Sequence, residues 1–430
     1  MPTQDLAMGD DLRAFVDASP SPSHAVAELA RRLTAAGFTE LAEADRWAPA
    51  PGGRHFVVRH GSLVAFRTGT GPLAESGLRM VGAHTDSPTF KVRPHADVRQ
   101  AGYRLVGVEP YGGGLWHTWL DRELTVAGRL ALRSGSPSHP STALVRLPGA
   151  PLRLPSLAIH LDRGVREGLV LDPQRHLIPV WDGDLGTEPG LAEALASAVG
   201  VDPDAVVGHD LVLADTQPAA RAGADGTWVA APRLDNLACC HAGLLALLAA
   251  PASERTQLLV CNDHEEVGSG SMSGARGSFL EDVVRRLAAA TDPGDPQAVH
   301  RALARSVLVS ADMAHAVHPT RYDRHEPAHQ PQLGGGPVLK INANQAYATD
   351  GTTGGWFAER CAEAGVPLQR FVSRADLPCG STIGPLTATR LGVATVDVGS
   401  PMLAMHSCRE LASALDVPLM VGALTACFSD

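Results

Sequence analysis

Five apolar segments of the sequence each run into a residue type that can bind a metal ion. In chain order, the side chains that follow them are those of His84, Asp235, Glu266, Asp312 and His406. Imidazole and carboxylate ligands without thiolate are typical of zinc, manganese or cobalt in a hydrolytic site. A catalytic zinc ion takes three protein ligands and a water molecule. Five ligands are therefore too many for one ion, and they fit two ions if one carboxylate bridges them.

Two more carboxylates stand beside these candidate ligands. Glu265 directly precedes Glu266, and consecutive side chains diverge, so one can bind metal while the other acts as a general base. Asp86 lies two residues after His84, on the same side of an extended chain, so its carboxylate can orient the imidazole. Each motif taken singly is common as surface charge or as a helix cap. Their recurrence after five apolar segments is what predicts a metal site.

The segments that must position these side chains alternate between strand-like and helix-like patterns. Strands are predicted at 76–83, 257–262, 306–310 and 392–398, and helices within 10–37 and at 236–250, 280–290, 354–364 and 407–427. This alternation favours an α/β fold with a mostly parallel central sheet covered by helices. Ligands bind at the carboxyl ends of the strands of such a sheet, so the candidate ligands are expected to converge on one edge.

The pattern changes between about residues 94 and 230, where Pro and Gly are frequent and short β-like runs alternate with turns. The runs are 124–133, 141–147, 156–161 and 211–217, with one helix at about 190–199. We interpret 94–230 as an inserted, mostly β domain, and 1–93 together with 231–430 as the catalytic domain. Exposed strand edges in the insert favour association with partners.

Composition excludes several classes of protein. A charged fraction of 19% and a net charge of −10 do not fit a disordered chain, and without a Lys/Arg-rich stretch we expect no nucleic-acid partner. The amino-terminal segment is acidic where a secretory signal would be basic, and the longest apolar stretch, 236–251, is too short to span a membrane. Seven cysteines without a CxxC pair indicate reduced thiols, so a cytoplasmic location is expected and no membrane partner.

At the same residues the sequence resembles the aspartyl aminopeptidase family of two-zinc metallopeptidases. The matching segments cover nearly the whole chain in order. They are GAHTDSPTFKVRP (82–94), YGGGLWHTWLDRELTVAGRL (111–130), LAIHLDR (157–163), RLDN (233–236), NDHEEVGSGS (262–271), SADMAHAVHP (310–319), GGGPVLKINANQAYATD (334–350), PCGSTIGP (378–385) and MHSCRE (405–410).

The resemblance implies a role for each candidate ligand. His84, Asp235 and Asp312 would hold one zinc ion, while Asp235, as the bridge, would hold the other together with Glu266 and His406. Glu265 would be the general base and Asp86 would orient His84. A water between the ions would become more acidic and attack the peptide carbonyl.

The resemblance also implies how substrate is bound. Lys340 and Tyr347 would contact the acidic side chain of an amino-terminal Asp or Glu, and His315 is a further candidate for substrate binding. His160, in the insert, would reach the active site of a neighbouring subunit and help to stabilise the tetrahedral intermediate. The expected assembly is a dodecamer built from dimers. One departure is Ala346, which stands where the family often has arginine.

Three other functions remain open from the sequence. A two-metal aminopeptidase of broader, neutral specificity would keep the ligands without needing Lys340. A two-metal deacylase or carboxypeptidase shares the HxD motif, the paired glutamates and a late histidine. A silent assembly module would keep the fold, although such proteins typically lose the base or a ligand first, and here Glu265 and all five ligands are present.

Overall fold

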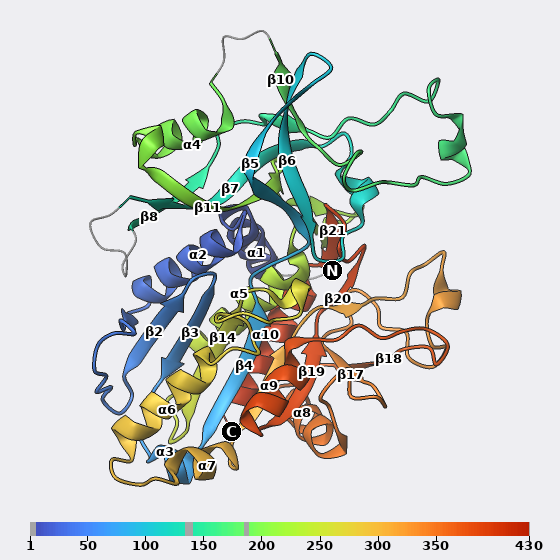
Figure 1. Ribbon diagram of the computed structural model, residues 1–430. Coiled ribbons are helices and arrows are strands. Elements are labelled where there is room, and N and C mark those ends of the chain that lie inside the picture. Colours follow the sequence, from blue (N-terminus) through green and yellow to red (C-terminus); the bar gives the residue numbers. More distant parts are fainter. Residues whose placement is uncertain (1–5, 134–140, 185–188, 430) are drawn as a thin grey trace.

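The computed structural model describes residues 6–133, 141–184 and 189–429, so the first five residues of the amino-terminal segment lie outside it. Its centre is a nine-stranded sheet (Figure 1). The spatial order is β1 (Thr39–Glu40), β2 (Arg54–Arg59), β3 (Ser62–Arg67), β14 (Thr256–Asn262), β4 (Leu78–His84), β15 (Val307–Ala311), β19 (Ala394–Gly399), β17 (Val338–Ile341) and β18 (Gln369–Val372). β14, β4, β15 and β19 run parallel, and antiparallel neighbours β3 and β17 flank them. The predicted α/β class is confirmed, with a parallel centre in a mixed sheet.

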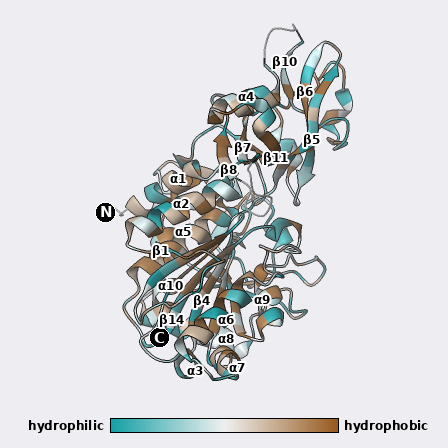
Figure 2. Ribbon diagram, turned by 60° about the vertical axis from the view of Figure 1, so that its left-hand side comes forward, coloured by the Kyte–Doolittle hydropathy of each residue, from teal (hydrophilic) through white to brown (hydrophobic). Residues whose placement is uncertain are grey.

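Helices cover both faces of this sheet. One face packs against α1 (Ala7–Ala18), α2 (Pro22–Ala35), α5 (Leu234–Ala249), α8 (Gly351–Glu363) and α10 (Asp416–Ser429). The other packs against α3 (Leu73–Ser76), α6 (Phe279–Thr291), α7 (Ala298–Leu303) and α9 (Ile383–Leu391). Along β4, Val81 and Ala83 join the first apolar cluster and Met80 joins the second. Because both faces are buried, the central strands are mostly apolar, and Figure 2 shows much of them in brown among the helices.

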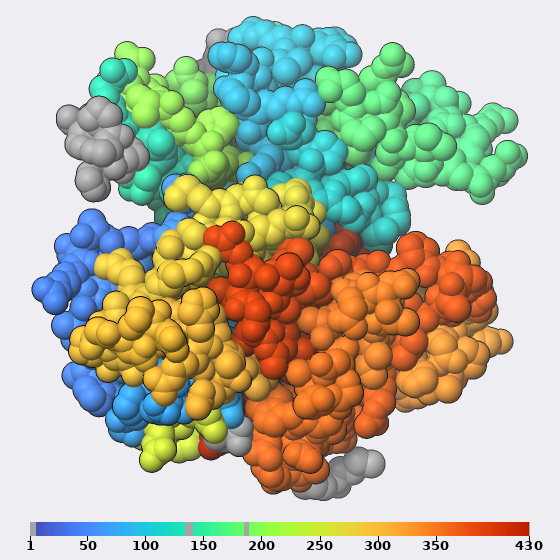
Figure 3. Space-filling view, turned by 60° about the horizontal axis from the view of Figure 1, so that its bottom comes forward, coloured from blue at the N-terminus to red at the C-terminus, as the bar shows by residue number. Residues whose placement is uncertain are grey.

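A second sheet lies mostly within the predicted insert and is antiparallel throughout. It contains β5 (Thr89–Gln100), β6 (Tyr103–Tyr111), β7 (Glu123–Leu132), β8 (Ser141–Arg146), β9 (Leu152–Arg153), β10 (Val180–Gly183) and β11 (Val206–Asp215). β11 pairs with both β5 and β7, so the strands close around an apolar cluster of their own, beside which α4 (Leu191–Val199) packs. β5 begins before the expected start of the insert at 94. Figure 3 shows this barrel, in cyan and green, stacked on the helix-covered part.

A third, five-stranded sheet was not expected. Its order is β12 (Ala220–Ala222), β13 (Trp228–Ala231), β21 (Glu410–Ser413), β20 (Pro401–Leu403) and β16 (Ala314–His315). The prediction that 407–427 is largely helical is therefore wrong at its start, because β21 precedes α10. β21 pairs with the nearby β20 and with β13, and β13 lies far away in the sequence, where a local pattern does not reveal it.

The predicted strand at 156–161 is also wrong. The segment has no strand structure, and it lies in a loop, residues 155–179, that projects sideways from the barrel (Figure 1). Leu157, Ile159 and Leu161 alternate as they would in a half-buried strand, but all three are exposed. Alternation predicts a strand only where a neighbouring strand supplies hydrogen bonds, and none lies beside this segment among the described residues.

The other predicted helices and strands are each found within a few residues of the expected bounds. The seven cysteines, all within the described residues, are free thiols, and six of them are buried. None of the helices in the described part of the chain is both long and apolar enough to span a bilayer.

Candidate active site

Three of the predicted ligands follow neighbouring parallel strands of the central sheet. His84 ends β4, and Asp312 directly follows β15. Glu266 lies after β14 in a single 3-10 turn, η4 (Glu265–Val267). Because the carboxyl ends of parallel strands meet at one edge of the sheet, the structure brings these three side chains together there.

Asp235 and His406 reach the same place from the five-stranded sheet, where they follow β13 and β20. The expectation that all five ligands lie at the edge of one sheet is therefore wrong for these two. Glu410, the first residue of β21, is buried and accepts hydrogen bonds from the backbone N–H of Asp235 (3.0 Å) and of His406 (2.7 Å). One carboxylate thus fixes both segments relative to each other.

The Asp235 carboxylate lies between the two histidines. Its Oδ1 is 3.4 Å from Nε2 of His84, and its Oδ2 is 3.4 Å from Nε2 of His406. Nε2 of His84 is also 3.3 Å from Oδ1 of Asp312, and Nε2 of His406 is 3.4 Å from Oε1 of Glu266. The structure therefore contains two triads of ligand atoms, each within 4.8 Å, that share Asp235.

The chemistry of these groups fits metal ions. Oδ1 of Asp235 and Oε1 of Glu266 are buried and accept no hydrogen bond from any residue that the structure describes, which is costly unless a cation neutralises them. Burial raises the pKa of Glu266 well above its ordinary value, and the Asp235 carboxylate adds to this. Burial alone lowers the pKa of His406, but Asp235 and Glu266 outweigh it and raise that pKa to about 10. The five side chains could hold two divalent cations that relieve this crowding of acidic groups.

Asp86 supports the site through the backbone of the paired glutamates. Its Oδ1 accepts from the N–H of Glu265 (3.0 Å), and its Oδ2 accepts from the N–H of Glu266 (3.1 Å) and from the Tyr111 hydroxyl (2.7 Å). Nδ1 of His84 is closer to the carbonyl oxygen of Asp86 (3.0 Å) than to its carboxylate (3.5 Å). The carboxylate therefore mainly positions η4, and the carbonyl is the closer partner that orients His84.

Tyr111→Phe is expected to lower kcat about tenfold with little change in KM, because it removes one charge-assisted hydrogen bond from Asp86 and loosens η4. The measurement is steady-state kinetics together with zinc content. Tyr103→Phe is the matched control, since Tyr103 lies on the same strand and is exposed. A raised KM with an unchanged kcat would show that Tyr111 does not act through the Glu265 turn.

Glu265 lines the same cavity as the ligands and is held by its backbone rather than by a side-chain hydrogen bond to another described residue. Burial raises its pKa to about 7, and the carboxylates of Asp312 and Asp86 act in the same direction. A carboxylate with this affinity for protons, next to two candidate metal positions, has the properties of a general base.

The predicted substrate residues line this cavity, which has a volume of about 200 Å³ and also contains the ligands. Lys340 is buried, and its Nζ donates to the carbonyl of Met313 (3.1 Å) and lies 3.6 Å from Oδ2 of Asp312. The same Nζ is 5.1 Å from the centre of the Tyr347 ring. His315 lines the cavity at the end of β16, where its ring packs edge-on against Phe371.

His160 is exposed in the loop 155–179 and does not line this cavity. Within one chain the structure therefore separates it from the other candidate residues.

Sequence reasoning missed three residues that support the site. Glu410 and Tyr111 stand inside the motifs MHSCRE and YGGG, but nothing in their spacing shows what they contact. Asp397 is buried at β19 and accepts from Oγ1 of Thr382 and from the N–H of Ala348, both at 2.6 Å. It joins the Tyr347 segment to the start of α9. A buried acidic residue within an apolar strand was the available signal.

Comparisons with known proteins agree along the whole chain. The family model described as Aminopeptidase I zinc metalloprotease (M18) matches residues 15–428. A Mycobacterium leprae protein described as a probable M18 family aminopeptidase 2 is 49% identical over 425 residues, which are 98% of this chain and 99% of that protein. A Pseudomonas aeruginosa protein of the same description is 48% identical over 421 residues, 96% of each chain.

Solved structures of related proteins share this fold. The cryo-EM structure of the Ape4 and Nbr1 complex matches with a TM-score of 0.93 and 34% identity, covering 100% of this chain and 87% of that one. The S. cerevisiae mApe1 dodecamer matches with a TM-score of 0.85 and 29% identity, covering 98% and 96%. The resemblance seen in the sequence is thus confirmed, and the chain belongs to the M18 family of aminopeptidases, which are zinc metalloproteases.

Proposed function

We propose that this aminopeptidase releases amino-terminal Asp, and also Glu, from peptides with two zinc ions bound per subunit. The observation that carries the proposal is the arrangement of two ligand triads sharing Asp235 beside a cavity in which Lys340 is buried. Lys340 and Lys91 are the only lysines in the chain, whose other basic residues are arginines. A lysine buried at this position therefore stands out against the composition of the chain.

Each triad would hold one ion. His84, Asp235 and Asp312 would bind the first, and Asp235, Glu266 and His406 the second, with manganese or cobalt as possible substitutes. When bound, the ions supply an acidified water and polarise the peptide carbonyl. Asp86 and Glu410 would keep the ligand segments in place through the backbone hydrogen bonds described above.

Glu265 would carry the proton. Its carboxylate would take a proton from the attacking water and return it to the nitrogen of the leaving amine. Burial raises the pKa of Glu265 above its ordinary value, which strengthens the carboxylate as a proton acceptor.

Lys340 would select the acidic side chain. An ammonium group has three hydrogens to donate. One is used on the carbonyl of Met313, and Asp312 lies at longer range. A further donor can therefore face a substrate carboxylate, with Tyr347 and His315 forming the adjacent walls. The hydrogen bond would be charge-assisted and largely shielded from solvent, which favours Asp and Glu over neutral residues.

We also propose that the chain forms a dodecamer built from dimers, with 94–230 as the inserted association domain and 1–93 with 231–430 as the catalytic domain. The related mApe1 structure is a dodecamer, and the loop 155–179 exposes Leu157, Leu161 and Val170, an apolar surface of the kind that partners cover. In that assembly His160 would reach a neighbour's active site. Light scattering should give twelve times the 44.9 kDa of one chain. The free, mostly buried thiols fit a cytoplasmic location.

Lys340→Met is expected to lower kcat/KM for Asp-p-nitroanilide about 10- to 100-fold and to change Leu-p-nitroanilide much less, because one charge-assisted hydrogen bond to substrate is lost. The assay uses Asp, Glu, Ala, Leu and Arg substrates, as purified, after chelation, and after zinc, manganese or cobalt is restored. Lys91→Met is the matched control, since Lys91 does not line this cavity.

Three outcomes would change the proposal. Wild-type activity mainly on Ala or Leu would replace acidic selectivity with a broader aminopeptidase. Activity that chelation does not abolish would remove the metal mechanism. Inactivity on every substrate, with two zinc ions bound, would favour the deacylase or the silent module.

A further inference from the structure

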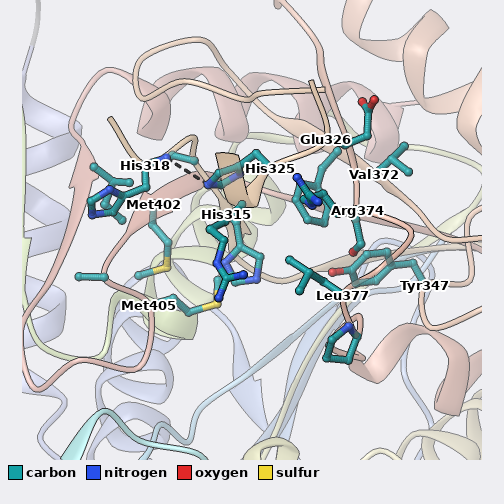
Figure 4. A pocket seen from close by; sticks show the side chains of 18 residues that line it. His315, His318, His325, Glu326, Tyr347, Val372, Arg374, Leu377, Met402 and Met405 are labelled. Carbon is teal, nitrogen blue, oxygen red and sulfur yellow. Dashed lines mark hydrogen bonds between the residues drawn. The ribbon is translucent and has the colours of Figure 1, made fainter. Parts of the chain in front are cut away.

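A second cavity, of about 310 Å³, adjoins the catalytic cavity (Figure 4). We name it the adjoining cavity. The two cavities share His315, Tyr347, Gly380 and Met405 in their walls. The catalytic cavity, at about 200 Å³, is smaller than ordinary small-molecule sites, which begin at about 300 Å³. It has room for little more than the first residue of a peptide, so the rest of the chain must continue past one of its walls.

Part of the lining of the adjoining cavity is apolar and adaptable. Phe371, Leu377, Met402 and Met405 belong to this lining, and Figure 4 shows the two methionines on the same side as His315. Methionine side chains adapt to ligands of different shapes. This apolar lining therefore suits peptide side chains of varied size rather than one particular residue.

The charged side chains around the cavity differ in whether another residue already binds them. The Arg374 guanidinium binds both carboxylate oxygens of Asp376 and the carbonyl of Asp323. Glu326 is bound by the ring of His329. Arg324 is exposed at the rim, and no described residue forms an ion pair or hydrogen bond with its guanidinium; Asp376 is near enough to interact, but its oxygens face Arg374.

Two histidines of the cavity, His315 and His325, hold protons less readily than an ordinary histidine. Nε2 of His325 accepts a hydrogen bond from the backbone N–H of His318 (3.1 Å), drawn as a dashed line in Figure 4, so that nitrogen carries no proton. Burial lowers the pKa of His325 and of His315 below its ordinary value. Of the two arginines that line the cavity, Arg324 is therefore the one whose guanidinium no described residue binds, and it can pair with an anionic ligand.

We propose that the adjoining cavity binds the second and third residues of the peptide, and that Arg324 pairs with a carboxylate at the third. The carboxylate can come from an acidic side chain or from the free carboxyl terminus of a tripeptide. This inference rests on the proposed aminopeptidase site and adds a second determinant of selectivity, on the side of the leaving peptide. Substrates rich in acidic residues, or short acidic peptides, would satisfy both Lys340 and Arg324.

The test compares Arg324→Gln with wild type on four substrates. Three are the peptides Asp-Leu-Glu-amide, Asp-Leu-Gln-amide and Asp-Leu-Gln with a free carboxyl terminus; the fourth is Asp-p-nitroanilide. The variant is expected to lower kcat/KM about threefold to fivefold for the peptides that carry a third-residue carboxylate. It should leave the blocked Gln peptide and the anilide unchanged. Arg321→Gln is the matched control, because Arg321 is an exposed arginine of the same loop that does not line the cavity.

The outcomes separate this inference from the proposed function. Equal losses on all substrates, equal losses in the Arg321 control, or no loss on either carboxylate-bearing peptide would overturn it. A loss on Asp-p-nitroanilide relative to Leu-p-nitroanilide would place the first side chain, not the third residue, near Arg324. If wild type does not cleave Asp-p-nitroanilide, the proposed acidic selectivity at the first residue fails. The same peptides are then made with the amino-terminal residue that wild type cleaves fastest. Those peptides test Arg324 independently of the first residue.

Discussion

Glu265→Gln is expected to lower kcat by about 10²- to 10⁴-fold while zinc content stays at the wild-type level. Glutamine keeps the shape of the side chain and the backbone hydrogen bond to Asp86, but it cannot accept and return a proton. The loss should be in kcat rather than in KM, since proton transfer belongs to the reaction and not to binding. Steady-state kinetics on the best substrate, together with metal analysis of the same samples, would measure it.

Glu254→Gln is the control for this experiment, because Glu254 is an exposed glutamate that does not line the cavity. Two results would contradict the assignment of Glu265. Activity within about tenfold of wild type would exclude a general base at this position. Loss of activity together with loss of zinc would make Glu265 a ligand, because His84, Glu265 and Glu266 form a third group that could hold an ion.

Asp235→Asn is expected to weaken both metal sites at once and to reduce activity at least a thousandfold. Its two oxygens face the two histidines separately, and the neutral amide offers one oxygen in place of two. Removing a residue that merely orients a ligand already costs about 10- to 100-fold in metal affinity, so removing a shared ligand should cost more. Zinc per subunit after dialysis, measured by elemental analysis, is expected to fall below one.

Asp312→Asn is the comparison, because Asp312 belongs to only one of the two triads that share Asp235. It should lose about one ion and keep the other. Equal zinc content in the two variants would contradict the bridging role of Asp235. Both variants keep their backbone contacts, and for Asp235 these include the N–H bond to Glu410, so circular dichroism should report an unchanged fold.

The pattern of apolar residues along the chain predicted the structure best where a strand leads directly to a candidate ligand. The apolar runs ending at His84 and before Asp312 predicted β4 and β15, and the direction of a parallel strand then places its last side chain at the edge of the sheet. The pattern failed at 156–161, where alternation was present but none of the described residues forms a partner strand beside the segment. It also failed at 410–413, where one of the two strand partners, β13, lies far away in the sequence.

By itself, the sequence determined the candidate ligand types, the α/β class and the family, because ligand chemistry, apolar periodicity and ordered motifs are properties of neighbouring residues. Only the tertiary structure decided which groups hold the candidate ligands still. Glu410 joins Asp235 to His406, and Asp86 binds the backbone of the Glu265 turn. Apart from the bond between Glu410 and the nearby N–H of His406, these hydrogen bonds join a side chain to a backbone N–H far away in the sequence. Every non-proline residue has such an N–H, so the partner leaves no mark in the sequence, and only the folded chain selects it.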